Sequence, residues 1–120
     1  WSSDVCSSDL NHRLFTYEKP IVAFMDGITM GGGVGISQPA RYRVATENTR
    51  FAMPETGIGL FPDVGGGWYL SRLPGRVGQY LALTGYRADG AECLSLGLAG
   101  DAPVPAAGAP LRVTLRLATS

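Results

Sequence analysis

Two carboxylates in a stretch rich in glycine and proline are the side chains of this sequence best suited to chemistry. Glu55 follows Pro54 and Asp63 follows Pro62, and both acids have apolar or aromatic neighbours. Apolar surroundings raise the pKa of a carboxylate by desolvation, which suits a general acid, a general base or a nucleophile. A simpler interpretation makes Asp63 the N-cap of a helix that begins at Val64, and Glu55 a solvated loop acid. Spacing alone favours the simpler interpretation.

A glycine cluster at residues 31–35 is the second candidate. It follows a short apolar run, residues 21–25, that is typical of a strand buried on both faces, and a helix is predicted from about Gly32 to Ala40. Free N–H groups at a helix N-terminus can hold a phosphate, or the oxyanion that forms when an acyl carbonyl is attacked. The cluster lacks the features of a P-loop and of a dinucleotide-binding loop. Tight packing of the helix on the strand explains the glycines equally well.

Composition excludes several classes of function. The chain has ten basic and ten acidic residues, so no excess of positive charge indicates nucleic acid or an anionic membrane as a partner. No apolar run reaches the roughly 18 to 20 residues of a membrane span. His12 is the only histidine, which argues against a Ser-His-Asp triad and a His-rich metal site. Two cysteines, Cys6 and Cys93, provide no disulfide framework, which favours a reducing compartment.

The first half of the chain is predicted to supply the strands that position these groups. A helix ends near Tyr17, because the residue before Pro20 is pushed out of the helical region. Short strands are predicted at residues 43–46 and 51–52. Residues 54–67, with both acids, are predicted to form an ordered loop.

The second half is predicted to be helical. Helices are expected at residues 68–73 and at residues 77–84, where Gly85 closes the second one. Asp89 and Glu92 have the spacing of a capping box, which begins a further helix. Strands followed by helices in this way predict an α/β fold.

Two long motifs resemble the crotonase (enoyl-CoA hydratase/isomerase) superfamily. They are GITMGGGVG, residues 27–35, and FAMPETGIGLFPDVGGG, residues 51–67. Within the superfamily they are most similar to the branch that hydrolyses 3-hydroxyisobutyryl-CoA. The similarity implies a partial crotonase-like ββα-spiral fold, truncated at both ends, in which residues 11–99 are the central part of the domain.

The resemblance also implies roles for particular residues. Hydratases of the superfamily use two glutamates, whereas this chain has Gly35 at the first position and retains Glu55 at the second. Asp63 stands where the hydrolases carry an aspartate, which points to thioester hydrolysis as in valine breakdown. Gly31 and Gly32 would bind the thioester oxygen, with the amide of Gly32 as an oxyanion donor. Glu55 would attack the acyl carbon or activate a water, and Asp63 would hold the hydroxyl end of the substrate or assist proton transfer.

Coenzyme A is part of the implied substrate, so the resemblance implies no cofactor and no metal. The expected partner is an acyl-CoA thioester, with neither nucleic acid nor a membrane, and the oligomeric state is open. The implied location is a bacterial-type cytoplasm or the mitochondrial matrix. Two alternatives stay open, namely an enoyl-CoA hydratase or isomerase that uses Glu55 alone, and an inactive piece with no catalysis of its own.

The two ends of the chain differ from the part between them. Residues 1–10, WSSDVCSSDL, repeat Ser-Ser-Asp and look like translated sequencing adapter, with Ser7 at a position where the family has a glutamate. We therefore predict that residues 1–10 are a non-native tract. Residues 100–120 have a single acidic residue, Asp101, and many alanines. We treat them as an uncertain tail, for which a shifted reading frame is one explanation.

Overall fold

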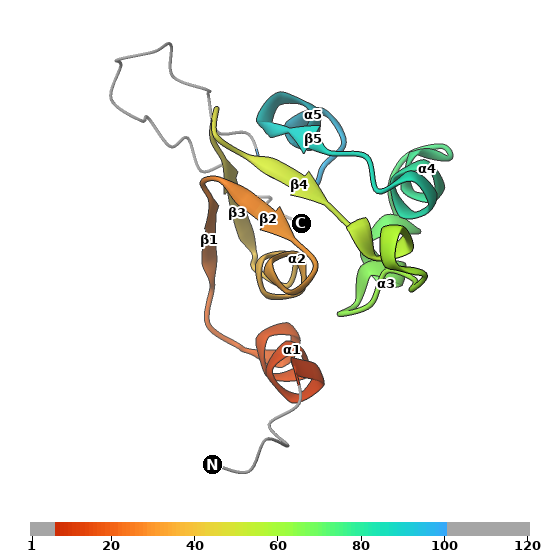
Figure 1. Ribbon diagram of the computed structural model, residues 1–120. Helices are drawn as coiled ribbons and strands as arrows, with labels where there is room; N and C mark the ends of the chain where they lie inside the picture. The colour runs from red at the N-terminus through yellow and green to blue at the C-terminus, as the bar shows by residue number, and fades with distance from the viewer. Residues whose placement is uncertain (1–6, 101–120) are drawn as a thin grey trace.

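The computed structural model describes residues 7–100, in which short strands and helices alternate (Figure 1). The strands are β1 (Val22–Met25), β2 (Ile28–Met30), β3 (Tyr42–Ala45), β4 (Arg50–Ala52) and β5 (Ala88–Asp89). The helices are α1 (Ser7–Thr16), α2 (Gly32–Ser37), the 3₁₀ helix η1 (Pro54–Ile58), α3 (Gly66–Leu70), α4 (Val77–Thr84) and α5 (Gly90–Ser95). The predictions for residues 1–10 and 100–120 lie mostly outside the described residues, although α1 begins within the first tract.

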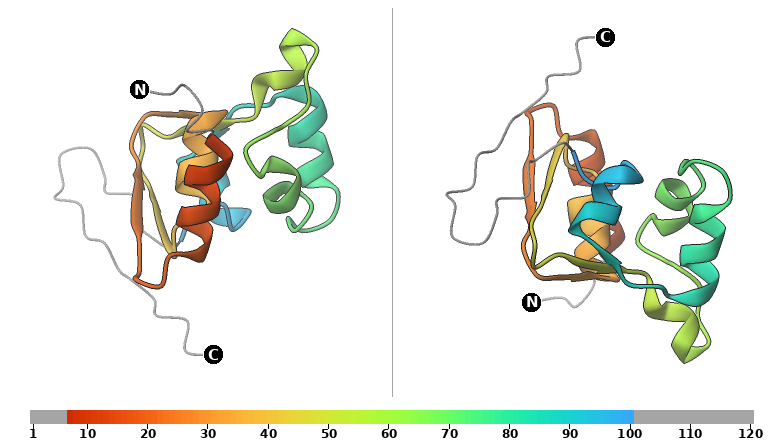
Figure 2. Two further views of the ribbon diagram at one scale, coloured as in Figure 1. Left: turned by 90° about the horizontal axis from the view of Figure 1, so that it is seen from below. Right: turned by 90° about the horizontal axis from the view of Figure 1, so that it is seen from above.

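Pairs of strands followed by helices repeat along the chain. Strands β1 and β2 lead into α2, and β3 and β4 then lead into η1 and α3. Each strand of the second pair lies parallel to its counterpart in the first, because β1 pairs with β3 and β2 pairs with β4. The chain passes from one sheet to the other at Gly27, whose φ of 113° favours glycine, and β5 adds an antiparallel edge to β4. Figure 2 shows the two sheets from opposite sides.

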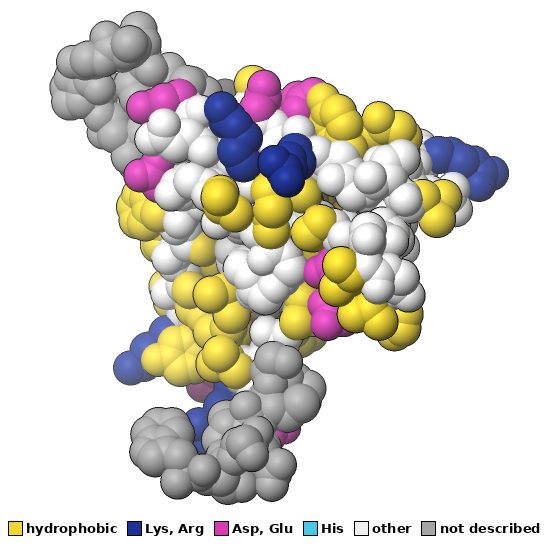
Figure 3. Space-filling view, in the orientation of Figure 1, with side chains coloured by type: hydrophobic (Ala, Val, Ile, Leu, Met, Phe, Trp, Pro, Cys, Tyr) yellow, Lys and Arg dark blue, Asp and Glu magenta, His cyan; other side chains and the backbone are white. Residues whose placement is uncertain are grey.

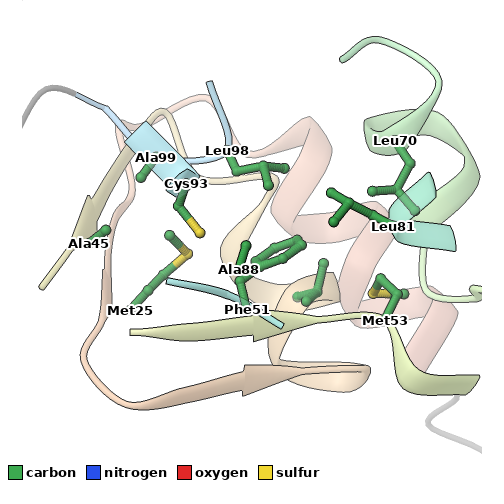
Figure 4. Packing of buried hydrophobic residues seen from close by; sticks show 11 residues of the cluster. Met25, Ala45, Phe51, Met53, Leu70, Leu81, Ala88, Cys93, Leu98 and Ala99 are labelled. Atoms are coloured by element: carbon green, nitrogen blue, oxygen red, sulfur yellow. The ribbon is translucent and has the colours of Figure 1, made fainter. Parts of the chain in front are cut away.

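The hydrophobic core lies between the two sheets and the helices (Figure 4). Phe51 of β4 and Met53 are almost completely buried at its centre, together with Leu81 of α4. Helices α3 and α4 pack closely because residue 78 is a glycine: a Cβ atom at this position would overlap the carbonyl oxygen of Leu70. This packing fixes the loop that carries the two candidate acids, which leads from the core residue Met53 to α3.

The structure differs from the predicted elements at several places. Within the described residues, strand β1 is buried on one face only: Met25 packs in the hydrophobic core and is 2% exposed, whereas Phe24 points to the opposite face and is 60% exposed. Strands β2 and β5 are too short to show an alternating pattern, and the sequence did not predict them. Helix α2 ends at Ser37 rather than at residue 40, and α3 begins at Gly66 rather than at residue 68.

Large hydrophobic side chains are exposed on several surfaces, and yellow side chains are spread over the face in Figure 3. Ile28 is 80% exposed, Ile58 is 76% exposed and Phe61 is 74% exposed.

Candidate functional site

Glu55 lies in the first turn of η1, and its side chain points into the protein. Pro54 begins the helix, where its fixed φ suits the first helical position. Gly59 ends it with φ at 78°, and the backbone N–H of Leu60 donates to the carbonyl oxygen of Glu55 at 3.0 Å. Helix α4 packs against η1, with Gly85 close to Pro54. Backbone hydrogen bonds and packing therefore fix the position of Glu55.

The carboxylate of Glu55 lies against the turn that begins α2. Gly31 is the N-cap of that helix with φ 48° and ψ −113°, a conformation that only glycine adopts readily. A Cβ atom at Gly31 would lie 3.1 Å from Oε1 of Glu55. The glycine cluster therefore does more than pack a helix on a strand, because it lets the backbone approach this carboxylate.

Glu55 is 9% exposed, and its Oε2 atom is buried without a hydrogen-bond partner among the described residues. A buried carboxylate oxygen without a partner costs free energy, and such atoms usually have an explanation in a bound water, a ligand or catalysis. The prediction that Glu55 is a solvated loop acid is wrong, because the turn at Gly31 and the core beneath η1 exclude solvent from it.

The backbone N–H of Gly32 is the second group of this site. In α2, the amides of Val34 and Gly35 donate to the carbonyl oxygen of Gly31 at 3.0 and 3.1 Å. The amide of Gly32 has no acceptor in residues 7–100, and the residue is exposed. The structure thus brings Gly31, Gly32 and Glu55 together, with a free amide directly after the glycine that contacts the carboxylate.

Asp63 lies on the loop between η1 and α3, and its side chain is exposed. The prediction that it caps a helix is wrong, because α3 begins at Gly66 with Gly65 as its N-cap and without a side-chain cap. Its backbone carbonyl accepts a hydrogen bond of 2.6 Å from the amide of Gly66. Its carboxylate forms no hydrogen bond with another group of residues 7–100.

Val64 joins this loop to α2, and sequence reasoning missed it. A Cβ atom at Gly35 would lie 2.6 Å from Cβ of Val64 and 3.2 Å from Nδ2 of Asn11 on α1. Position 35 therefore has no room for a side chain, and Glu55 faces no second carboxylate from it. The signal in the sequence was a β-branched residue inside a run of turn residues, Asp63 to Gly67.

Other chemical groups of the described residues are poor candidates. Burial raises the pKa of the Cys93 thiol to about 12, so this cysteine stays protonated and is a weak nucleophile. Residues 7–100 bring no three metal-binding side chains together. None of the helices described has both the length and the hydrophobicity that a membrane crossing requires. A buried carboxylate beside a free amide is a pair suited to acyl chemistry.

Comparison with known proteins identifies the family to which the chain is similar. The family model described as enoyl-CoA hydratase/isomerase matches residues 7–115. The mitochondrial 3-hydroxyisobutyryl-CoA hydrolase of Xenopus tropicalis is 63% identical over 90 residues, which are 75% of this chain and 23% of that protein. The mouse protein of the same name is 60% identical over 90 residues, with the same two shares. The chain therefore spans about a quarter of the length of the curated relatives it matches.

Solved structures show the same arrangement of elements. An enoyl-CoA hydratase from Rhodobacter sphaeroides matches 78% of this chain with a TM-score of 0.75 and 46% identity, over 28% of its own length. A carnitinyl-CoA dehydratase from Mycobacterium thermoresistibile matches 78% of this chain with a TM-score of 0.74 and 49% identity, over 27% of its own length.

Proposed function

Because this chain belongs to the enoyl-CoA hydratase/isomerase (crotonase) family, we propose that it is the central part of a hydrolase that cleaves the thioester of 3-hydroxyisobutyryl-CoA or a similar 3-hydroxyacyl-CoA. The partial ββα-spiral fold predicted from the sequence is confirmed by the solved structures of that family. The observation that carries the proposal is the single buried carboxylate: Glu55 lies against Gly31, and Val64 leaves no space for a side chain at position 35.

The amide of Gly32 and the carboxylate of Glu55 would divide the chemistry between them. The thioester oxygen would accept a hydrogen bond from the Gly32 amide, and one such donor lowers the barrier by about 3 kcal/mol in comparable sites. Oε2 of Glu55, which has no partner among the described residues, would take a proton from water or attack the acyl carbon directly. If water attacks, the C–S bond breaks to give the free acid directly, and the proton held by Glu55 passes to the sulfur, which leaves as the thiol of coenzyme A. If Glu55 attacks, the C–S bond breaks to leave an anhydride with Glu55; a water then hydrolyses this anhydride to the free acid, and the sulfur takes up the proton that this water releases.

Asp63 would bind the hydroxyl end of the substrate or assist a proton transfer. Its carboxylate is exposed, and a carboxylate oxygen can accept a hydrogen bond from a hydroxyl group. An Asp63→Asn variant should lower kcat/KM at least tenfold while Tm changes by no more than a few degrees. Unchanged turnover in this variant would remove Asp63 from the mechanism.

A water-adding activity on enoyl-CoA, with Glu55 alone, is the alternative. It needs a carboxylate to place the water and a proton donor at the second carbon, and position 35 cannot supply either in this structure. The mitochondrial matrix is the compartment we propose, since the similar hydrolases of frog and mouse are named as mitochondrial proteins.

The test uses the full-length protein that carries residues 11–99. Given 3-hydroxyisobutyryl-CoA, it should release free thiol, measured with a chromogenic thiol reagent, and the enoyl absorbance of crotonyl-CoA should not change. The reverse pattern, with loss of enoyl absorbance and no thiol, would favour the hydratase alternative and end the hydrolase proposal. If neither thiol release nor loss of enoyl absorbance is observed, the result favours an inactive protein.

A further inference from the structure

The turn that follows Asp63 has an unexpected residue. The amide of Gly66 donates to the carbonyl oxygen of Asp63, and the two residues between them, Val64 and Gly65, have φ values of 44° and 85°. Positive φ at both central positions is the signature of a type I′ turn, which asparagine, aspartate and glycine dominate. A β-branched side chain in this region is an outlier, because its Cβ atom is crowded by the backbone.

The side chain of Val64 is packed tightly despite this unfavourable backbone conformation. It packs on the hydrophobic core, and its Cβ and Cγ2 atoms lie 2.6 and 3.0 Å from the place that a Cβ atom at Gly35 would take. Asn11 of α1 approaches the same place, at 3.2 Å. Strained backbone persists where the surroundings determine it, and here α2 and the hydrophobic core both pack against Val64.

Glycine or asparagine at position 64 would satisfy the turn without strain, so the turn itself does not require valine. A valine side chain adds contact between this loop and α2. Helix α2 begins at Gly31 and Gly32, beside Glu55. Asp63 directly precedes Val64, so this contact connects Asp63 to α2, the start of which lies beside the buried carboxylate of Glu55.

We propose that Val64 is a positioning residue: by packing on Gly35 it holds the strained turn and fixes Asp63 relative to Gly32 and Glu55. This inference rests on the proposed hydrolase function, and on the first of the two roles proposed there for Asp63, in which it binds the hydroxyl group of the substrate. Val64 itself touches no reacting atom. Its loss therefore affects recognition of the hydroxyl group and spares the attack on the thioester.

The test compares two substrates in the full-length protein, 3-hydroxyisobutyryl-CoA and isobutyryl-CoA, which lacks the hydroxyl group. Val64→Gly should lower kcat/KM for the hydroxylated substrate at least tenfold and for isobutyryl-CoA less than twofold. Tm should change little, because relief of the strain offsets the lost packing. Val64→Thr, which keeps the branched shape, is the matched control and should keep the ratio of the two kcat/KM values close to that of the wild type.

The outcomes separate this inference from the function on which it rests. A wild-type protein that cleaves neither substrate contradicts the hydrolase proposal. An active wild type whose Val64→Gly variant keeps its preference, or loses both activities equally, overturns the inference alone. If Val64→Gly does not fold, Val64→Asn carries the same comparison, because asparagine tolerates positive φ.

A stability measurement checks the contact independently of activity. Gly35→Ala should lower Tm, because the new methyl group overlaps Val64. In a Val64→Gly background the same substitution should lower Tm far less, because the space is then free. Equal losses in both backgrounds would show that Val64 and Gly35 are not coupled, and the inference would fail.

Discussion

Two glutamates of this chain, Glu55 and Glu92, both lie in the first turn of a short helix, but their carboxylates differ in burial and in hydrogen bonding. Oε1 of Glu92 accepts a hydrogen bond of 2.9 Å from the hydroxyl of Tyr86, and its Oε2 accepts one of 2.9 Å from the amide of Asp89. The amide of Glu92 in turn donates to Oδ1 of Asp89 at 2.9 Å. Glu55 is buried, and one of its oxygens has no partner among the described residues.

The difference separates a carboxylate that stabilises the fold from one that the fold keeps available. Glu92 completes a capping box, and each of its carboxylate oxygens accepts a hydrogen bond, one from the amide of the N-cap residue Asp89 and one from the hydroxyl of Tyr86. The burial of Glu55 lowers stability unless something binds to its free oxygen. A group kept in this state is typical of functional sites. The following predictions test this comparison in the full-length protein, from the largest expected effect to the smallest.

Glu55→Gln should have the largest effect. Loss of a catalytic acid or base commonly lowers turnover by about 10² to 10⁴-fold, and we expect kcat for thioester hydrolysis to fall within this range. Stability should stay the same or rise, because the substitution replaces a buried carboxyl group that lacks a full set of partners with an amide, which cannot ionise. Steady-state kinetics and thermal unfolding measure the two effects. A variant that unfolds at a much lower temperature but keeps its turnover would show that Glu55 serves stability and not catalysis.

Gly31→Ala should act on the same carboxylate from the other side. The new methyl group would lie 3.1 Å from Oε1 of Glu55 in a backbone conformation with φ 48°, so turnover should fall about tenfold or more. Gly75→Ala is the matched control, because Gly75 also has a positive φ, 59°, and a Cβ atom there would have no neighbour within 4 Å. Both variants should lose about 1 kcal/mol of stability or more. Equal turnover in the two variants would show that the Gly31 contact does not matter.

Glu92→Ala should show the opposite pattern to Glu55→Gln. It removes two hydrogen bonds at the start of α5, and we expect a loss of about 1 kcal/mol in the free energy of unfolding. Turnover per folded molecule should not change. Chemical denaturation and kinetics on the same preparation measure both quantities. A change in kcat here would mean that paired carboxylates also serve the reaction.

Asp26 should give the smallest effect, and one that depends on pH. Its Oδ1 accepts hydrogen bonds from the Thr46 hydroxyl at 2.6 Å and the Asn48 amide at 3.0 Å, and these bonds lower the pKa of the Asp26 carboxyl. The stability that they contribute is fully present above the unfolded pKa of about 3.9 and is lost as the pH falls through the lower folded pKa. Wild type should therefore exceed Asp26→Asn in stability at pH 7, and the difference should vanish in acid. If the difference in stability between the two proteins is the same at every pH, the effect comes from packing and not from the ionised carboxylate.

Local signals in the sequence predicted the helical half well. The capping box at Asp89 and Glu92 is formed as predicted, and Gly85 ends α4 with φ at 63°. These features succeed because the partners lie within a few residues of one another, so that their spacing alone fixes the geometry. Strands β2 and β5 could not be predicted, since two or three residues carry no period, and their pairing with β4 comes from distant parts of the chain.

The sequence by itself determined the family of this protein, the identity of its candidate acids and the ends of its later helices, because each of these is contained in a short continuous stretch. Only the tertiary structure decided that Glu55 is buried against Gly31, that Asp63 caps no helix and that Val64 fills the space beside Gly35. Each of these facts concerns segments that are separate in the chain and meet only in the packed fold. Burial and close approach arise from that packing, and spacing along the chain does not reveal them.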